Sequence, residues 1–242
     1  MNARNPAPAA PAGHPTRGKG AGPLARVMWA TAYLPRGPLG WVNARWTMPM
    51  ALGPIYPSMA AALQLREDDD LLEVGCGAGL FLAEQAARVG HVAGVDLSPI
   101  QVELARRRLA DRIAARTAEI TLGDAADLPW PDGRFSAVTS IAAFMTFPRP
   151  AHVLAEIHRV LRPGGRAVLH IGERTAPRTP THRGPSGIWV WSETDARHMV
   201  ERAGFTDVAV SYADASGHRR FARFVNRVAK TQDARLVQGV KV

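Results

Sequence analysis

The chain has 242 residues, of which 46% are hydrophobic and 21% are charged, as in ordinary globular proteins. Its length fits one domain with short appendages. No apolar run approaches the roughly 20 residues needed to span a bilayer, and the N-terminus lacks the apolar core of a secretory signal. We therefore expect a cytoplasmic protein without a membrane span.

Cysteine usage and charge bear on two kinds of site. Cys76 is the single cysteine, which excludes an intramolecular disulfide and a cysteine-built zinc site. The histidines lack ligand spacing, so no metal is expected. The formal net charge is +9, but the arginines are spread along the chain without a basic run interleaved with aromatic residues. Solvated faces are the favoured interpretation, and no nucleic-acid partner is expected.

Composition divides the chain into three regions. Residues 1–22 are rich in Pro, Ala and Gly, and they are predicted to form a flexible tail. Residues 23–65 are rich in aromatic residues and Met but interrupted by prolines, which predicts a cap of short helices. These helices either pack on the edge of the domain or form a lid over a pocket, and the two alternatives can hold together. Residues 66–242 are predicted to form the main domain.

From residue 70, short apolar segments alternate with amphipathic helical segments. This alternation predicts an α/β fold with a doubly wound, mostly parallel sheet covered on both faces. A helix over Asp195–Ala203 and a hairpin of strands Val208–Tyr212 and Phe221–Val228 are predicted to end the chain. The earlier predicted strands are Leu71–Val74, Val92–Val95, Ile120–Leu122, Phe135–Ile141 and Ala167–Ile171, and the helices are Leu80–Val89, Ile100–Ala110 and His152–Leu161.

A glycine-rich turn follows the first predicted strand. Gly75, Gly77 and Gly79 alternate with small residues before a helix begins. Glycines permit a tight turn and a close approach of backbone N–H groups to a ligand, and the helix N-terminus attracts anionic groups. A dinucleotide fingerprint would need a small residue where Leu80 stands, and a P-loop would need Gly-Lys-Ser/Thr. Both phosphate-binding alternatives are therefore disfavoured.

Acidic residues follow the next two predicted strands. Asp96 would lie beside the glycine turn at the carboxyl edge of the sheet, where it could accept both hydroxyls of a ribose. Ser98 and Pro99 already supply the start of the following helix, so Asp96 is not needed as its cap. Asp124, next to Ala125, could accept a hydrogen bond from an adenine amine, although a surface turn explains it equally well.

Four segments together resemble a known family. LLEVGCGAG, VAGVDLSPIQVELARRR, GDAADLPWPDGRFSAVTS and HVLAEIHRVLRPGGRAVL are similar, in this order, to the motifs of class I S-adenosylmethionine-dependent methyltransferases of the small-molecule and quinone type (methyltransferase type 11-like). The resemblance covers about residues 71–228. It implies a Rossmann-like, seven-stranded sheet with an antiparallel C-terminal strand. It also implies S-adenosylmethionine as cofactor and a small-molecule methyl acceptor as partner.

The resemblance also implies roles for single positions. The three glycines would line the methionine moiety of the donor, and Glu73 would orient their loop through backbone hydrogen bonds. Asp96 would bind the ribose and Leu97 would contact the adenine, with Asp124 and Ala125 at the adenine rim. The predicted cofactor-binding residues are Glu73, Gly75, Cys76, Gly77, Gly79, Asp96, Leu97, Gln101, Gly123, Asp124, Ala125, Ser140 and Ile141.

The chain departs from the family pattern after the fourth strand. Ser140 and Ile141 would face the donor and the substrate, but residues 142–146 lack the histidines that many relatives carry there. We therefore expect an apolar acceptor pocket and assign no catalytic residue. The weak candidates for a base are His170, which is more typical of a packed core residue, Glu173, His152 and His182. The predicted acceptor contacts are Tyr56, Met145 and Trp189.

Several functions stay open on the sequence alone. An NAD-dependent oxidoreductase is disfavoured by Leu80 and by the absence of a Tyr-x-x-x-Lys pair. A nucleic-acid methyltransferase lacks the Asn/Asp-Pro-Pro-Tyr/Phe motif but remains an alternative, as does a non-catalytic S-adenosylmethionine-binding protein. The Ala-, Arg- and Gly-rich composition suggests a role in secondary metabolism, and a homodimer stays open.

Overall fold

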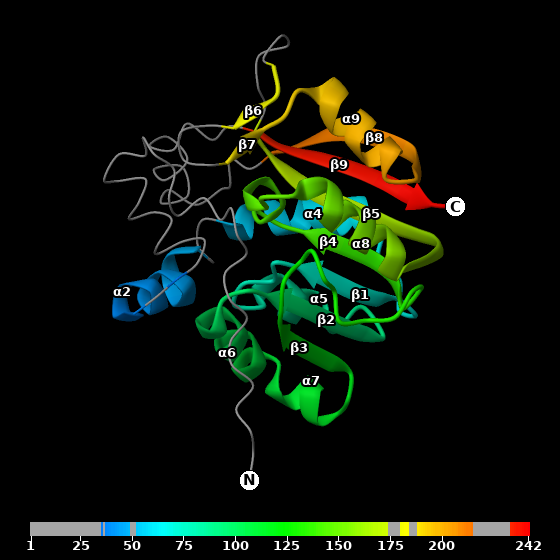
Figure 1. The fold of residues 1–242 in the computed structure, drawn as a ribbon. Helices are drawn as coiled ribbons and strands as arrows, with labels where there is room; N and C mark the ends of the chain where they lie inside the picture. The colour runs from blue at the N-terminus through cyan, green and yellow to red at the C-terminus, as the bar shows by residue number, and fades with distance from the viewer. Residues whose placement is uncertain (1–34, 36, 49–51, 174–179, 184–187, 215–232) are drawn as a thin grey trace.

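The computed structural model describes residues 35, 37–48, 52–173, 180–183, 188–214 and 233–242 (Figure 1). The predicted tail at residues 1–22 and the predicted strand at 221–228 lie outside the described residues. None of the helices in the described part of the chain is long and apolar enough to cross a bilayer.

A seven-stranded sheet in the order β3-β2-β1-β4-β5-β9-β8 forms the centre of the molecule (Figure 1). Strands β1 to β5 are parallel, and β9 runs antiparallel between β5 and β8. This arrangement confirms the predicted doubly wound, Rossmann-like α/β fold. The strands are β1 Asp70–Val74, β2 His91–Asp96, β3 Ala118–Leu122, β4 Phe135–Ser140, β5 Leu161–Glu173, β8 Phe205–Asp214 and β9 Asp233–Lys241; β6 His182–Arg183 and β7 Trp189–Val190 form a separate pair.

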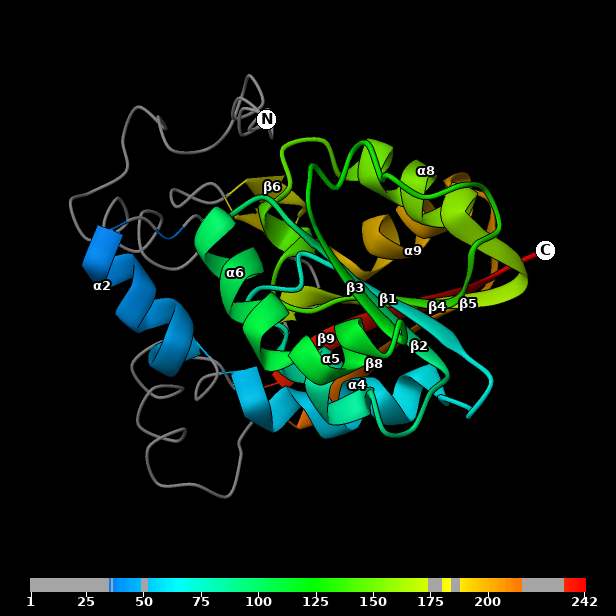
Figure 2. The same cartoon turned by 90° about the horizontal axis from the view of Figure 1, so that it is seen from below.

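Helices cover both faces of the sheet because successive strand residues point to opposite sides (Figure 2). Leu71 packs into the cluster that contains Phe81 of α5, whereas Leu72 packs into the cluster that contains Leu154 of α8. Helices α4, α5 and α6 lie on the first side, and α8 and α9 lie on the second. The helical elements are α2 Gly37–Val42, η3 Asn43–Thr47, η4 Gly53–Ile55, α4 Tyr56–Leu63, α5 Leu80–Gln85, α6 Pro99–Arg108, α7 Ala110–Ala114, η5 Phe144–Thr146, α8 Pro150–Val160 and α9 Glu193–Arg202.

Because Phe221–Val228 lies outside the described residues, the second strand of the C-terminal hairpin stays a prediction. In the described part of the chain, β8 pairs with β9, a strand that the sequence did not predict, and β9 also pairs with β5. The segment DARLVQGVK of β9 carries two cations, an acid and a glycine, so its composition does not indicate a strand. This segment forms a strand because it pairs with β5 and β8 on its two edges and buries Leu236 and Val237.

The region preceding β1 consists of two parts with different surroundings. Met59 and Leu63 of α4 are fully buried, and the Tyr56 ring contacts Phe81 edge-on at 5.5 Å between centroids. Helix α4 is therefore integrated into the core of the α/β domain. The continuous helical segment formed by α2 and η3 stands at the edge of the molecule beside α6 (Figures 1 and 2).

Candidate functional site

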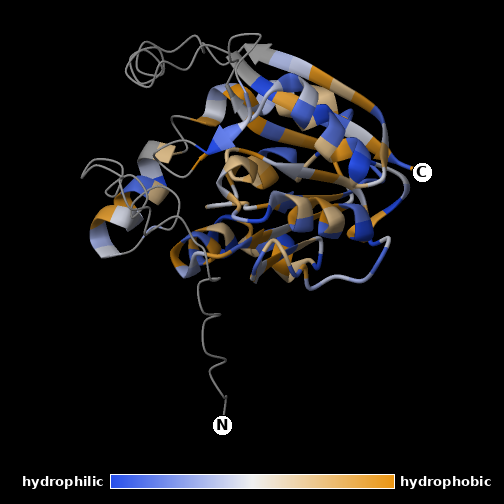
Figure 3. Ribbon diagram, turned by 45° about the horizontal axis from the view of Figure 1, so that its top comes forward, coloured by the Kyte–Doolittle hydropathy of each residue, from blue (hydrophilic) through white to orange (hydrophobic). Residues whose placement is uncertain are grey.

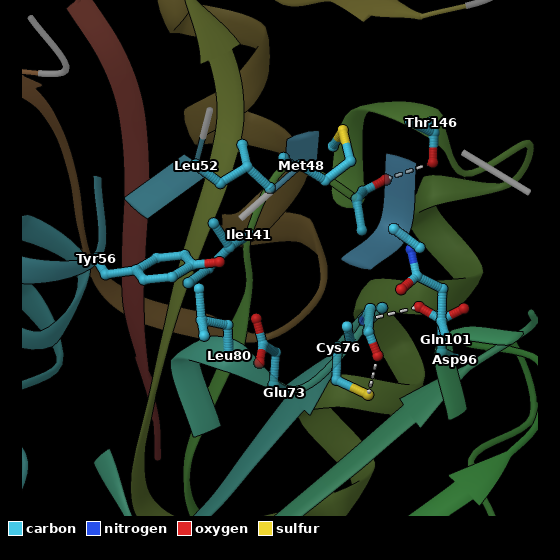
Figure 4. A pocket seen from close by; sticks show the side chains of 16 residues that line it. Met48, Leu52, Tyr56, Glu73, Cys76, Leu80, Asp96, Gln101, Ile141 and Thr146 are labelled. Carbon is cyan, nitrogen blue, oxygen red and sulfur yellow. Dashed lines mark hydrogen bonds between the residues drawn. The ribbon is translucent and has the colours of Figure 1, made fainter. Parts of the chain in front are cut away.

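A pocket lies at the carboxyl ends of β1, β2 and β4 (Figure 4). Strand β1 pairs with β2 on one side and with β4 on the other, so the chain connections that leave β1 and β3 run toward opposite edges of the sheet. Open α/β sheets bind ligands at such switch points. The lining residues come from these strand ends and from the region preceding β1. They are Ala44, Met48, Leu52, Tyr56, Glu73, Gly75, Cys76, Gly77, Ala78, Leu80, Asp96, Gln101, Ile141, Ala142, Ala143 and Thr146.

The three glycines of the turn each have positive φ, at 75°, 52° and 69°. The first residues of the turn are fixed to β2, because the N–H groups of Gly75 and Cys76 both donate to the Val95 carbonyl, at 2.8 and 3.0 Å. A Cβ at Gly75 would overlap with the Ala143 side chain, and one at Gly79 would lie 3.0 Å from the Ala105 Cβ of α6. The lack of a side chain at Gly75 thus leaves room for the loop after β4, and its lack at Gly79 leaves room for α6.

Asp96, at the end of β2, is the acid that organises the turn. Its carboxylate accepts hydrogen bonds from the N–H of Gly77 at 2.9 Å and from the N–H of Ser98 at 2.8 Å. Burial raises the pKa of Asp96 to about 6, although these two hydrogen bonds act in the opposite direction. Ser98 caps α6, as predicted, and Pro99 begins the helix.

The predicted role of Glu73 in orienting the turn is not supported, because its buried Oε2 atom has no hydrogen-bond partner. Asp96 performs that function instead. Burial, together with the nearby Asp96 and Glu84 carboxylates, raises the pKa of Glu73 well above its usual range. Gln101 of α6 also has a buried acceptor, Oε1, without a partner. Two unsatisfied acceptors therefore line one pocket, an arrangement that suits a ligand with hydrogen-bond donors.

The opposite end of the pocket is apolar. Figure 4 shows the Tyr56 ring beside Ile141 and Leu80, with Met48 and Leu52 above them. Burial is the main cause of the raised pKa of the Tyr56 phenol, which lies far above its usual value, so its hydroxyl stays protonated. The space left between the lining side chains is about 90 Å³.

Several residues predicted to bind the cofactor lie outside this pocket. The Ser140 hydroxyl donates to the Val74 carbonyl at 2.7 Å, and Asp124 accepts from the N–H of Ala126 at 2.9 Å in a local turn. Both side chains therefore have local partners. The predicted residues that do not line the pocket are Gly79, Leu97, Gly123, Asp124, Ala125 and Ser140.

Of the three predicted acceptor contacts, the structure brings only Tyr56 into the pocket. Met145 is buried in η5. The indole N–H of Trp189 donates to the Phe147 carbonyl at 3.0 Å, and its ring stacks on Trp191 at 5.2 Å. Trp189 thus supports the loop after β4 from outside the pocket. Its partner, Phe147, lies in a loop far away along the chain, so the sequence alone did not reveal this contact.

The candidate bases also lie apart from the pocket lining. His170 is a core residue, as its context indicated. Its Nδ1 accepts from the N–H of Ala142 at 3.2 Å, its Nε2 contacts the Gly172 carbonyl at 3.1 Å, and burial lowers its pKa to about 4. His152 and His182 are exposed, and the side chain of Glu173 lies outside the described residues. Among the described residues, no cluster of three potential metal ligands exists.

Sequence reasoning missed the loop residues Ala142 and Ala143. Ala142 has a φ of 55°, a conformation that its residue type does not indicate, and the His170 side chain holds its N–H. Ala44 and Leu52 were also missed, because only the fold brings the region preceding β1 over the ends of the strands.

Comparison with known proteins agrees with this architecture. The family described as "Methyltransferase domain" matches residues 72–169. Demethylmenaquinone methyltransferase of Symbiobacterium thermophilum is 40% identical over 116 residues, which cover 47% of this chain and 46% of that protein. The Clavibacter sepedonicus protein of the same name is 39% identical over 148 residues, which cover 60% of this chain and 57% of that protein. The chain thus spans about half the length of these curated relatives.

Solved structures share the fold at low sequence identity. The [4+2]-cyclase SpnF has a TM-score of 0.65 at 21% identity, covering 77% of this chain and 80% of its own. The 1,6-didemethyltoxoflavin-N1-methyltransferase of Burkholderia thailandensis has a TM-score of 0.60 at 20% identity, covering 82% and 81%.

The sheet order and the glycine turn define the class I, Rossmann-like methyltransferase fold. Residues 72–169 of this chain are similar to the methyltransferase domain family.

Proposed function

We propose that this protein transfers the methyl group of S-adenosylmethionine to a small, apolar acceptor. The observation that carries the proposal is the juxtaposition, in one pocket, of the glycine turn and Asp96 with an apolar end formed by Tyr56, Leu80 and Ile141. The demethylmenaquinone methyltransferases among the relatives support an acceptor of this kind.

The unsatisfied polar atoms of the pocket fit the proposed donor. Its ammonium group would satisfy the buried Oε2 of Glu73 or Oε1 of Gln101, and the free lone pairs of Asp96 would accept from the ribose hydroxyls. The backbone of the glycine turn would lie against the methionine portion. S-adenosylmethionine supplies an electrophilic methyl carbon bound to a sulfonium.

The contribution of the protein would then be positioning and exclusion of water. An apolar end without a base would hold the acceptor next to the donor, and alignment alone accounts for a large part of a rate enhancement. The Tyr56 hydroxyl, kept protonated by burial, would donate a hydrogen bond to the acceptor and fix its orientation.

The N-terminal side of the pocket would have to rearrange to admit the donor. The available space of about 90 Å³ is smaller than the 300–1,000 Å³ typical of small-molecule sites. We therefore propose that Ala44, Met48 and Leu52 move outward when the donor binds and then close over it, which makes this region the lid that its composition suggested. A cytoplasmic location and a role in secondary metabolism are part of the same proposal, and a homodimer stays open.

The test is incubation of the purified protein with methyl-labelled donor and, separately, quinones and other apolar metabolites, RNA and DNA. We expect label in an apolar small molecule, and less of it with Asp96→Ala. Label in nucleic acid would instead establish the nucleic-acid alternative. Tight donor binding with no transfer to any fraction would indicate a non-catalytic binding protein.

A further inference from the structure

The helical segment Gly37–Met48, formed by α2, η3 and Met48, has two apolar faces. Gly40 and Ala44 are buried, and Met48 lines the pocket. The opposite face is open to solvent, and Figure 3 shows that this helix carries hydrophobic residues. Its exposed fractions are 76% for Leu39, 43% for Trp41, 47% for Val42 and 55% for Trp46.

Among the described residues, this face holds most of the exposed large hydrophobic side chains. Four of the six in the described part of the chain lie on it, the others being Tyr212 and Val242. The solvent-facing side of a surface helix is normally polar, and clustered exposed apolar residues mark an interaction surface. The solvent-facing side chains Leu39, Trp41, Val42 and Trp46, with Arg45 between them, are called the tryptophan face below.

Charge indicates what covers the tryptophan face. The cations are spread along the chain, but the acidic residues are not. Residues 1–66 contain seven of the 30 Lys and Arg residues and none of the 21 Asp and Glu residues, so they carry seven of the nine excess positive charges. Within the face, the Arg45 guanidinium lies 4.3 Å from the centre of the Trp46 ring. Burial, with a contribution from Arg45, lowers the pKa of Arg108 on the adjacent α6.

We propose that the tryptophan face docks on the surface of an anionic lipid bilayer. Trp and Leu side chains insert at the boundary between headgroups and acyl chains, and a cation such as Arg45 pairs with anionic headgroups. A second copy of the chain fits less well, because a symmetric contact through this face would bring Arg45 of both copies together. Nucleic acid fits less well because Leu39 and Val42 offer it no partner.

Docking in this orientation has a consequence for the acceptor. The helix that would touch the lipid also lines the pocket through Ala44 and Met48 on its other side. The pocket would then open toward the bilayer, and the acceptor would be an apolar molecule dissolved in it. This consequence rests on the proposed function, whereas docking itself does not require methyl transfer.

The test is co-flotation of the full-length protein with unilamellar vesicles of phosphatidylcholine alone or with 30% phosphatidylglycerol. We expect binding to the anionic vesicles that is at least about tenfold stronger than to the neutral ones and is reduced by high salt. The double variant Trp41→Ser/Trp46→Ser should bind the anionic vesicles about tenfold or more weakly than wild type, and Arg45→Gln should bind them severalfold more weakly. Val242→Ser and Arg162→Gln, which change an exposed apolar residue and an exposed arginine elsewhere, should bind like wild type.

A second measurement on the unaltered protein keeps the proposal testable if the double variant fails to fold. Acyl chains brominated near the headgroup should quench part of the tryptophan fluorescence on binding, and chains brominated at the bilayer centre should quench less. Failure to bind anionic vesicles, or binding that the tryptophan variant retains, would overturn the proposal. A dimer that the tryptophan variant converts to monomers, without vesicle binding, would assign the face to a second copy. Donor affinity measured in parallel separates any of these outcomes from a failure of the proposed function.

Discussion

The two ends of the pocket are held by different parts of the fold. At the polar end, the glycine turn and Asp96 sit on the ends of β1 and β2, and each is fixed by backbone hydrogen bonds of 2.8–3.0 Å. At the apolar end, Met48 and Leu52 come from the region preceding β1, and Ala142 is held by the side chain of His170. The first end is part of the sheet, whereas the second is assembled from elements packed against it.

This difference suggests a division of labour. Strand ends cannot shift without disturbing the sheet, so they suit recognition of a constant group such as a methyl donor. Helices and loops at the edge can change without loss of the core, so they suit a variable acceptor and a pocket that opens and closes. Changes at the polar end should therefore weaken donor binding most, and changes at the apolar end should mainly alter binding of the acceptor.

The largest effect is expected for Gly75→Ala. The new methyl group would overlap with Ala143, in addition to the strain of a positive φ. Backbone strain costs about 1–2 kcal/mol and overpacking about 1–3 kcal/mol, so we expect donor affinity to fall on the order of a hundredfold, measured by calorimetry. Gly164→Ala is the matched control, because it has a φ of 74° with nothing within 4 Å of the added atom. Equal affinities of the two variants would show that the turn is not the donor site.

The second-largest effect on donor affinity is expected for Asp96→Ala. Hydrogen bonds to a charged group contribute about 1.5–3 kcal/mol each, so the variant should bind the donor at least about tenfold more weakly. Calorimetric titration with S-adenosylmethionine compares the two proteins. Unchanged affinity would remove Asp96 from the site.

The same carboxylate predicts a pH dependence of binding. Because burial raises the pKa of Asp96 to about 6, it is ionised above that pH and protonated below it. The ionised form is the better acceptor for ribose hydroxyls, so donor affinity should be constant above pH 7 and fall as the pH drops through 6. Titrations between pH 5 and 8 measure this profile. Asp96→Ala should lack the inflection, and an identical inflection in that variant would assign it to another group.

A smaller effect, on stability, is expected for Glu73→Gln. The raised pKa of Glu73 means that the folded protein retains a proton which the unfolded chain releases. Wild type should therefore lose stability as the pH rises from the unfolded-state pKa near 4.5 toward the raised folded-state pKa. Glutamine does not titrate, so the variant should have the higher Tm at pH 8 and a smaller excess in Tm over wild type at pH 5. Each kcal/mol of difference in the free energy of unfolding should shift the Tm by about 2–4 °C.

Differential scanning calorimetry at both pH values tests this prediction. Glu103→Gln, at an exposed position on α6, is the control and should show little change. A Tm difference for Glu73→Gln that is the same at pH 5 and pH 8 would contradict a raised pKa.

The smallest effect is expected for Tyr56→Phe, which removes one hydroxyl from the apolar end. Donor affinity should stay within about twofold, while the KM for the acceptor rises severalfold, because one hydrogen bond of about 0.5–1.5 kcal/mol is lost. Steady-state kinetics with an identified acceptor measure both quantities. If Trp189→Phe raised the acceptor KM and Tyr56→Phe did not, the acceptor would lie near Trp189 instead.

The polar end of the pocket could be predicted from the sequence for a physical reason. Alternating glycines after an apolar strand, and an acid at the end of the next strand, mark the carboxyl edge of a parallel sheet, because local geometry requires these residue types. The parallel arrangement of strands β1 to β5 follows from the alternation of apolar strands with amphipathic helices. The roles of Gly75 and Gly79 in admitting Ala143 and Ala105 were not visible, because those partners lie far away along the chain.

The apolar end could not be predicted in the same way. Ala142 and Ala143 carry no chemical signal, and Trp189 lies in the chain where a substrate contact was plausible but uses its N–H to hold Phe147. The composition of β9 conceals a strand that only pairing with β5 and β8 stabilises. Long-range packing therefore determines these features, and a single sequence does not reveal it.

The structure of the protein with S-adenosylhomocysteine bound is the most direct test of the proposed donor site. We predict the ribose hydroxyls within hydrogen-bond distance of Asp96, the homocysteine portion against the glycine turn, and Met48 and Leu52 displaced outward from their present positions. A complex in which the ligand binds elsewhere, or in which this pocket stays closed at saturating ligand, would contradict the account.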